Sequence, residues 1–232
     1  MFSLKLNQFN VFCFKSKKDF LNYISDRKNI LIAINAEKLL KEDLKLKNIV
    51  NNHIGYADGI GAVLALKKKG FSEAVKIPGS EFWLDIIREF HDKKSFYFIG
   101  SSDEVINLTT KKLKEEFLDI DIKGFRNGFF ENELDFDNTL SDIISKKPDV
   151  IFVAQGSPRQ EFTMDKMYNC YPALYMGLGG SFDIYSGLKQ RAPEFYLKNN
   201  LEWFYRLIKE PTRFTRQVSL LKFLILLLLN KI

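Results

Sequence analysis

The sequence predicts an α/β fold of the Rossmann-like type, with a largely parallel sheet and helices on both of its faces. Short apolar runs alternate along the chain with segments of helical spacing, an order typical of parallel strands joined by crossover helices. Of the 232 residues, 46% are hydrophobic, which is enough for a substantial core. No internal repeat or low-complexity linker divides the chain.

The expected strands are short apolar runs bounded by glycine or polar residues, at residues 30–34, 54–58, 95–99, 120–124, 149–154 and 173–176. The expected helices show apolar residues three and four positions apart, at residues 35–41, 59–69, 79–91, 103–117 and 158–168. Gly70 ends the second of these helices, and Pro158 occupies the first turn of the last one.

The composition of the chain changes near Pro193. We expect residues 1–194 to form the α/β core and residues 195–232 to form a C-terminal helical appendage, basic first and then apolar. The run 220–229 is interrupted only by Lys222 and is shorter than the roughly 20 apolar residues of a spanning helix. A basic segment beside an apolar helix favours attachment to an anionic membrane surface. The alternatives are a buried core helix and a contact between copies of the chain in a homo-oligomer.

The net charge of +6 fits an anionic partner, such as a phosphate-bearing substrate or a membrane, or a merely solvated basic surface. Nucleic acid is not expected, because the basic residues cluster beside leucine-rich sequence and not on an exposed aromatic platform. The first residues lack a long apolar run behind a basic start, so we expect no secretory signal and a cytoplasmic protein, peripheral on the inner face of the cell membrane.

The cysteines and histidines give no pattern typical of a metal site. Cys13 and Cys170 lack the CxxC spacing and have no histidine nearby, so we expect two reduced thiols. His53 and His91 are each isolated in the sequence, and we assign neither a catalytic role. We therefore expect no zinc site. We also expect no cofactor and no divalent metal ion, because arginines and loop N–H groups could stabilise a departing diphosphate instead.

Polar or glycine-rich motifs follow five of the expected strands, and ligands in such folds bind outside the carboxyl ends of the strands. Asn35 follows one strand, and Asp58 of the sequence Tyr-Ala-Asp-Gly-Ile-Gly follows another. Gly100 and the segments 155–160 and 177–183 follow three more. The sequence therefore predicts a single site at this edge of the sheet.

Each of these motifs has a functional and a structural interpretation. Asp58 is either a general base for a sugar hydroxyl or the N-cap of the next helix. Gln160, in the sequence Gln-Gly-Ser-Pro-Arg-Gln-Glu, can offer a hydrogen-bond donor and an acceptor to a sugar or a base. The structural interpretation is that this segment is only the turn between a strand and a helix. The loop around Gly179 matches neither a P-loop nor a dinucleotide fingerprint, yet its N–H groups suit a diphosphate.

Four arginines alternate with aromatic residues near the C-terminus, at Arg191, Arg206, Arg213 and Arg216. Guanidinium groups bind phosphate oxygens well, so they make a candidate diphosphate clamp. The alternative is an amphipathic surface helix with solvated arginines.

These motifs, in this order, resemble the WecG/TagA/CpsF family of glycosyltransferases. The resemblance covers roughly residues 30–216 and is most specific over 177–216, with Pro-Gly-Ser at 78–80 and Asn-Gly-Phe-Phe at 127–130 as further signatures. It implies an inverting bacterial enzyme of cell-envelope polysaccharide or teichoic acid synthesis. Such an enzyme takes an N-acetylmannosamine-like hexosamine or a related hexose from a UDP-sugar donor and transfers it to a polyprenyl-diphosphate-linked sugar acceptor.

The resemblance also implies roles for single residues. Asp58 takes the place of the catalytic base and Gln160 that of the polar glutamine of the family's Pro-Lys-Gln-Glu. Arg206, Arg213 and Arg216 correspond to arginines of the appendage that reach the diphosphate. Asn35 matches the asparagine of the family's Thr-Pro-Asn.

At the Thr-Pro-Asn motif this sequence departs from the family pattern, because Ala33 stands in place of the threonine. The departure keeps open one alternative, a non-catalytic nucleotide-sugar-binding or phosphate-binding module on the same fold. A second alternative is a membrane-associated scaffold that uses the C-terminal tail to form oligomers.

Overall fold

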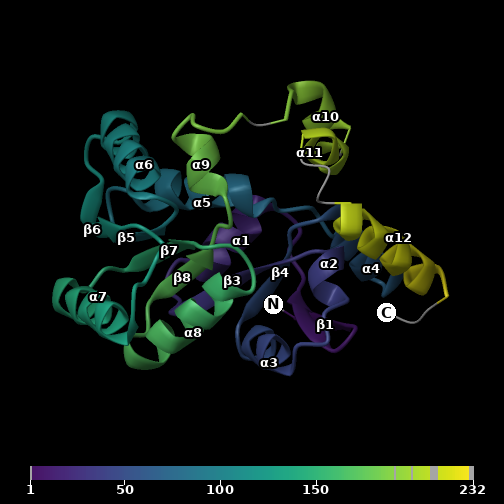
Figure 1. Ribbon diagram of the computed structural model, residues 1–232. Coiled ribbons are helices and arrows are strands. Elements are labelled where there is room, and N and C mark those ends of the chain that lie inside the picture. The colour runs from purple at the N-terminus through teal and green to yellow at the C-terminus, as the bar shows by residue number, and fades with distance from the viewer. Residues whose placement is uncertain (1, 191, 200, 210–213, 230–232) are drawn as a thin grey trace.

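The protein is described here by a computed structural model that covers residues 2–190, 192–199, 201–209 and 214–229 (Figure 1). The described residues form one eight-stranded sheet with the order β1-β2-β4-β3-β8-β7-β5-β6. All neighbouring strands pair in parallel except β1 and β2, which form an antiparallel hairpin at one edge. The strands are β1 (Ser3–Leu6), β2 (Phe9–Phe12), β3 (Asn29–Ile34), β4 (Ile54–Ala57), β5 (Ser95–Gly100), β6 (Asp121–Arg126), β7 (Val150–Ala154) and β8 (Leu174–Gly177).

Helices cover both faces of the sheet, as the sequence predicts, so the Rossmann-like α/β class is confirmed (Figure 1). Strands β4, β5, β7 and β8 are buried along their whole length, which explains their continuous apolar runs. One face packs against α2 (Ala36–Leu39), α3 (Leu44–Asn52), α4 (Ile60–Lys68), α7 (Glu133–Lys146), α8 (Arg159–Cys170) and α12 (Phe214–Leu228). The other packs against α1 (Lys17–Ile24), α5 (Gly79–Phe90), α6 (Asp103–Glu116) and α9 (Ser181–Tyr185).

Several elements escape the sequence analysis. The hairpin of β1 and β2 turns at Asn7 and Gln8, which both have positive φ although neither is glycine, so the usual turn signal is missing. Helices α1, α3 and α7 were also not predicted. Within the expected helical appendage, the segment after Pro193 forms two short helices, α10 (Glu194–Lys198) and α11 (Glu202–Lys209).

Helix α12 contains most of the apolar C-terminal run and lies against α2 and α4 (Figure 1). Phe223 is fully buried, and Leu227 belongs to the same core cluster. Lys68 of α4 donates to the carbonyl oxygen of Leu227 at 2.5 Å. The opposite side of α12 exposes further apolar residues, which are Leu221, Ile225, Leu228 and Leu229. No helix in the described ranges is long and apolar enough to cross a membrane.

Candidate active site

Four of the residues singled out in the sequence lie at the carboxyl ends of four adjacent strands. In sheet order, Asp58 follows β4, Asn35 follows β3, Gly179 follows β8 and Gln160 lies in the loop and helix after β7. After β3 the chain turns toward β4, whereas after β8 it turns in the opposite direction along the sheet, toward β5. There Asp183 accepts a hydrogen bond at 3.2 Å from Ser101, the residue that follows β5. Ligands of open α/β sheets bind at such a reversal.

Asp58 does not cap the helix that follows it, because Gly59 is the N-cap of α4 and that cap has no side-chain hydrogen bond. Its Oδ1 atom instead accepts the backbone N–H of Gly79, the first residue of α5, at 2.7 Å. The backbone N–H of Asp58 donates to Ile34 in β3 at 3.0 Å. The carboxylate is thus half-buried and fixed at the positive end of α5, an arrangement that suits an anion.

Tyr56 lies close to this carboxylate, and the sequence analysis gave it no role. It is fully buried, and its hydroxyl has no hydrogen-bond partner among the described residues. A Cβ atom at Gly79 would lie 2.7 Å from this hydroxyl and 3.5 Å from Oδ1 of Asp58. Burial, with the charges of Asp58 and Glu161, raises the pKa of Tyr56 well above its usual value, so the phenol stays neutral.

Asn35 lies where the loop after β3 meets the loop after β4. Its Oδ1 atom accepts the backbone N–H of Lys38 at 2.9 Å and so caps α2. A Cβ atom at Gly59 would lie 3.2 Å from the Cβ of Asn35, so the glycine after Asp58 allows a close approach of the two loops.

Gln160 joins the β7 and β8 loops. Its Oε1 atom accepts the backbone N–H of Gly179 at 2.8 Å, and its Nε2 atom lies 3.4 Å from Oε1 of Glu161. Gly179 has a positive φ of 60°, a conformation that glycine adopts without strain. Glu161 also forms an ion pair of 2.6 Å with Lys38, and both side chains are buried. Neither Lys38 nor Glu161 was assigned a role from the sequence.

A pocket of about 240 Å³ opens beside Gly179. Its lining contains an exposed aromatic ring, Phe129, and a buried amide oxygen, Oε1 of Gln155, which has no partner in the described part of the chain. The remaining lining residues are Ser101, Gly128, Ala154, Gly156, Arg159, Gly179, Gly180 and Asp183. The pocket therefore combines backbone N–H groups, one arginine and an aromatic face.

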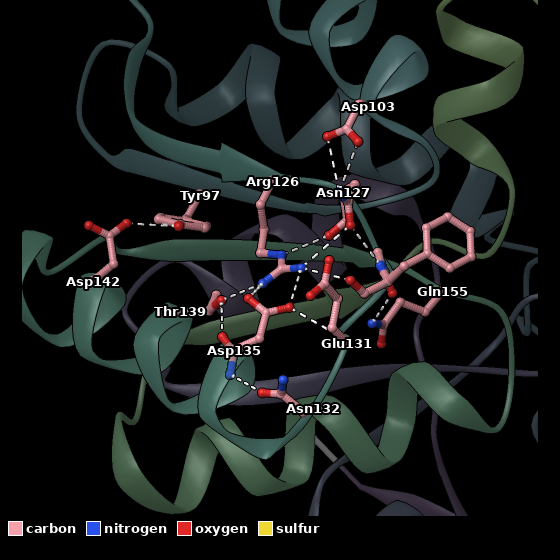
Figure 2. A network of polar contacts seen from close by, with 12 residues as sticks. Tyr97, Asp103, Arg126, Asn127, Glu131, Asn132, Asp135, Thr139, Asp142 and Gln155 are labelled. Atoms are coloured by element: carbon pink, nitrogen blue, oxygen red, sulfur yellow. Dashed lines mark hydrogen bonds and ion pairs between the residues drawn. The ribbon is translucent and has the colours of Figure 1, made fainter.

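A polar network holds the 127–130 loop against this pocket (Figure 2). Arg126, at the end of β6, donates to both carboxylate oxygens of Asp135, at 2.7 and 3.1 Å, and to the carbonyl oxygen of Phe129 at 2.8 Å. On the other side, Gln155 donates to the carbonyl oxygen of Gly128 at 2.7 Å. The Arg126 guanidinium and the backbone N–H of Glu131 hold the pKa of the Asp135 carboxyl below its usual value.

The side chains of the four candidate arginines lie outside the described part of the structure. Arg191 and Arg213 lie outside the described residues. Arg206 belongs to α11 and Arg216 to α12, but their side chains are also outside the description. The diphosphate clamp therefore stays a prediction.

Two Asp-x-Asp triplets, a motif that many metal-dependent glycosyltransferases use to hold a cation, occur at residues 119–121 and 135–137. Asp121 begins β6 at the opposite end of the sheet, where it pairs with Lys123 at 2.7 Å. Asp135 belongs to the Arg126 network. Within the described ranges, no group of three or more His, Cys, Asp or Glu side chains is arranged to hold a metal ion.

The comparison with known families agrees with this geometry. The sequence model of the glycosyl transferase WecG/TagA/CpsF family matches residues 7–232, which is nearly the whole chain. The match includes the strand-end motifs and the C-terminal helices, so it extends beyond a shared α/β fold. The chain therefore belongs to the WecG/TagA/CpsF family of glycosyl transferases.

Proposed function

We propose that this glycosyltransferase is an inverting enzyme of bacterial cell-envelope polysaccharide or teichoic acid synthesis. It moves a hexose or an N-acetylhexosamine of the N-acetylmannosamine type from a UDP-sugar to a polyprenyl-diphosphate-linked sugar. The observation that carries the proposal is the row of Asp58, Asn35, Gly179 and Gln160 along four adjacent strand ends. One crevice can then hold both the sugar donor and the group that activates the acceptor.

Asp58 is the proposed general base. It takes the proton from the acceptor hydroxyl while the oxygen attacks the anomeric carbon from the face opposite UDP. The bond between that carbon and the diphosphate oxygen breaks, and UDP leaves as an anion. The hydrogen bond from Gly79 occupies Oδ1 and fixes the orientation of the carboxylate, as a general base requires.

The nucleotide of the donor is proposed to occupy the pocket beside Gly179. Phe129, which is 61% exposed, offers a ring face for a base, and Asp183 offers acceptors for ribose hydroxyls. The backbone N–H groups of the glycine-rich loop suit the diphosphate. With Arg191, Arg206, Arg213 and Arg216 they would stabilise the leaving group, so we propose that no divalent metal ion or other cofactor is needed.

The membrane surface is the proposed location of the reaction, on the cytoplasmic side. The exposed apolar side of α12 continues onto α4, whose Ile60 and Leu64 are also exposed. Gly61 and Lys68 both contact α12. Leu64 lies three residues after Gly61 and four before Lys68, so it is on the same side of α4, next to α12. Lys67 of α4 and Lys222 of α12 are exposed on the same two helices and suit anionic lipid headgroups.

The direct test is a transfer assay. The protein is incubated with a synthetic lipid-diphosphate sugar and a panel of UDP-sugars, and the products are identified by mass. A product heavier than the acceptor by one sugar, formed in the presence of EDTA, is expected. Binding of UDP without transfer or donor hydrolysis would instead support the non-catalytic alternative, which the replacement of threonine by Ala33 keeps open.

A further inference from the structure

The buried ion pair of Lys38 and Glu161 contacts two of the strand-end residues, Asn35 and Gln160, and has no part in the reaction proposed above. Lys38 is 4% exposed and Glu161 is 1% exposed, and their charged atoms are 2.6 Å apart. Oε2 of Glu161 is buried without a hydrogen-bond partner among the described residues. Such a pair is a costly way to hold two helices together, because two apolar side chains would stabilise the fold as well or better.

The contacts of the pair indicate what it does instead. Because Gly179 contributes an N–H donor, the Gln160 amide must turn its oxygen toward Gly179 and its Nε2 toward Glu161. A Cβ atom at Gly177 would overlap this amide, so the amide packs closely against the end of β8. Glu161 supplies the acceptor on the side of Gln160 that faces away from Gly179, and Lys38 holds the carboxylate in place.

Lys38 itself belongs to α2, the helix directly after β3, and its backbone N–H donates to Oδ1 of Asn35, the N-cap of that helix. One residue thus connects the loop after β3 with the loops after β7 and β8. We propose that Lys38 is a positioning residue, which acts through Glu161 and Gln160 to set the 177–180 loop for the diphosphate of the donor. The part that concerns the donor rests on the proposed function, whereas the coupling of Lys38 to the loop does not.

The test compares three variants. Lys38→Met leaves the Glu161 carboxylate buried without its cation and is expected to lower the melting temperature, or to prevent folding. The double variant Lys38→Met with Glu161→Met removes both charges, so it is expected to fold and to melt close to the unmodified protein. Lys45→Met, at an exposed lysine of α3, is the matched control.

Two measurements separate positioning from general stability. In the folded double variant, deuterium uptake at the amides of 177–180 should be at least about tenfold faster, and the Kd for UDP should rise by a similar factor, as expected when a hydrogen bond to a charged group is lost. Uptake elsewhere in the sheet should not change, and Lys45→Met should match the unmodified protein in both measurements.

A double variant that folds and keeps both its UDP affinity and its uptake at 177–180 would overturn the proposal. If the unmodified protein does not bind UDP, the proposed donor is wrong, but the exchange measurement still decides the coupling. Faster uptake confined to 177–180 would then support Lys38 as the residue that positions this loop, and unchanged uptake would refute it.

Discussion

Gly79 donates its backbone N–H to Oδ1 of Asp58 across 2.7 Å, so the proposed base is held by the first turn of a helix that begins 21 residues later in the chain. The two residues come from different motifs, Tyr-Ala-Asp-Gly and Pro-Gly-Ser, and meet at the carboxyl end of β4. The pairing gives the Pro-Gly-Ser segment a physical role, because a side chain at Gly79 would collide with Tyr56.

Asp58→Asn is expected to lower turnover by about 10²–10⁴-fold, the usual contribution of a general base. The amide oxygen of Asn can still accept the Gly79 N–H, so the melting temperature and the UDP affinity should change little. Initial rates with the lipid-linked acceptor, measured beside calorimetric binding of UDP, check both statements. Turnover close to that of the unmodified protein would remove Asp58 from the mechanism.

Gly79→Ala tests the contact with Tyr56. Alanine normally favours a helix over glycine by about 1 kcal/mol, but here its Cβ would lie 2.7 Å from the Tyr56 hydroxyl. We expect lower stability and at least tenfold lower turnover, because Asp58 must shift with α5. Thermal melts and rates of Ser80→Ala, one residue further along the same helix, provide the control. An alanine variant that is more stable and fully active would contradict this account.

The two sides of α12 should respond differently to substitution. Ile225→Glu with Leu229→Glu changes only exposed apolar positions, so it should reduce co-sedimentation with anionic lipid vesicles and leave the melting temperature unchanged. Phe223→Ala should instead cost about 3–5 kcal/mol of unfolding free energy, as for other buried aromatic residues. Leu118→Glu, on an exposed loop residue, controls for added charge. If the variant with Ile225→Glu and Leu229→Glu binds vesicles as strongly as Phe223→Ala and Leu118→Glu do, the result would argue against a membrane role for α12.

Arg126→Met should loosen the 127–130 loop, because this arginine joins Asp135 to the carbonyl oxygen of Phe129 (Figure 2). The expected result is faster deuterium uptake over 127–130 and about tenfold weaker UDP binding, with the β7 and β8 amides unaffected. Lys123→Met, at an exposed ion pair of the same strand, should change neither quantity. Unchanged UDP affinity in a loosened loop would place the nucleotide elsewhere.

His53 should make stability depend on pH. Burial lowers the pKa of His53 below its usual value, although Asp165, 3.8 Å away, acts in the opposite direction. The unfolded chain therefore binds this proton more readily than the folded protein does. The stabilisation from neutral His53 is complete above about pH 6.5 and is lost as pH falls through the lowered pKa. Urea unfolding at several pH values between 5 and 8 should show that the free energy of unfolding depends less steeply on pH for His53→Gln than for the unmodified protein.

The sequence alone determined the α/β class, the expected strands in the core and the edge where the polar motifs gather, because buried parallel strands and glycine-bounded loops leave local patterns. Asn35, Asp58, Gln160 and Gly179 could be selected on that basis. The hairpin at Asn7 and Gln8 could not, because its turn uses left-handed backbone without a glycine.

Tertiary structure alone decided which groups touch. Lys38 lies 123 positions from Glu161 in the sequence, and Gly79 lies 21 positions from Asp58, so no local pattern could pair them. The apolar run near the C-terminus is equally ambiguous as a sequence, because leucines suit a core and a lipid surface alike. The packing of α12 against α2 and α4 resolves it, because Phe223 and Leu227 are buried there and Leu221 and Ile225 stay exposed. Periodicity describes one element, whereas burial and charge pairing depend on which other elements pack against it.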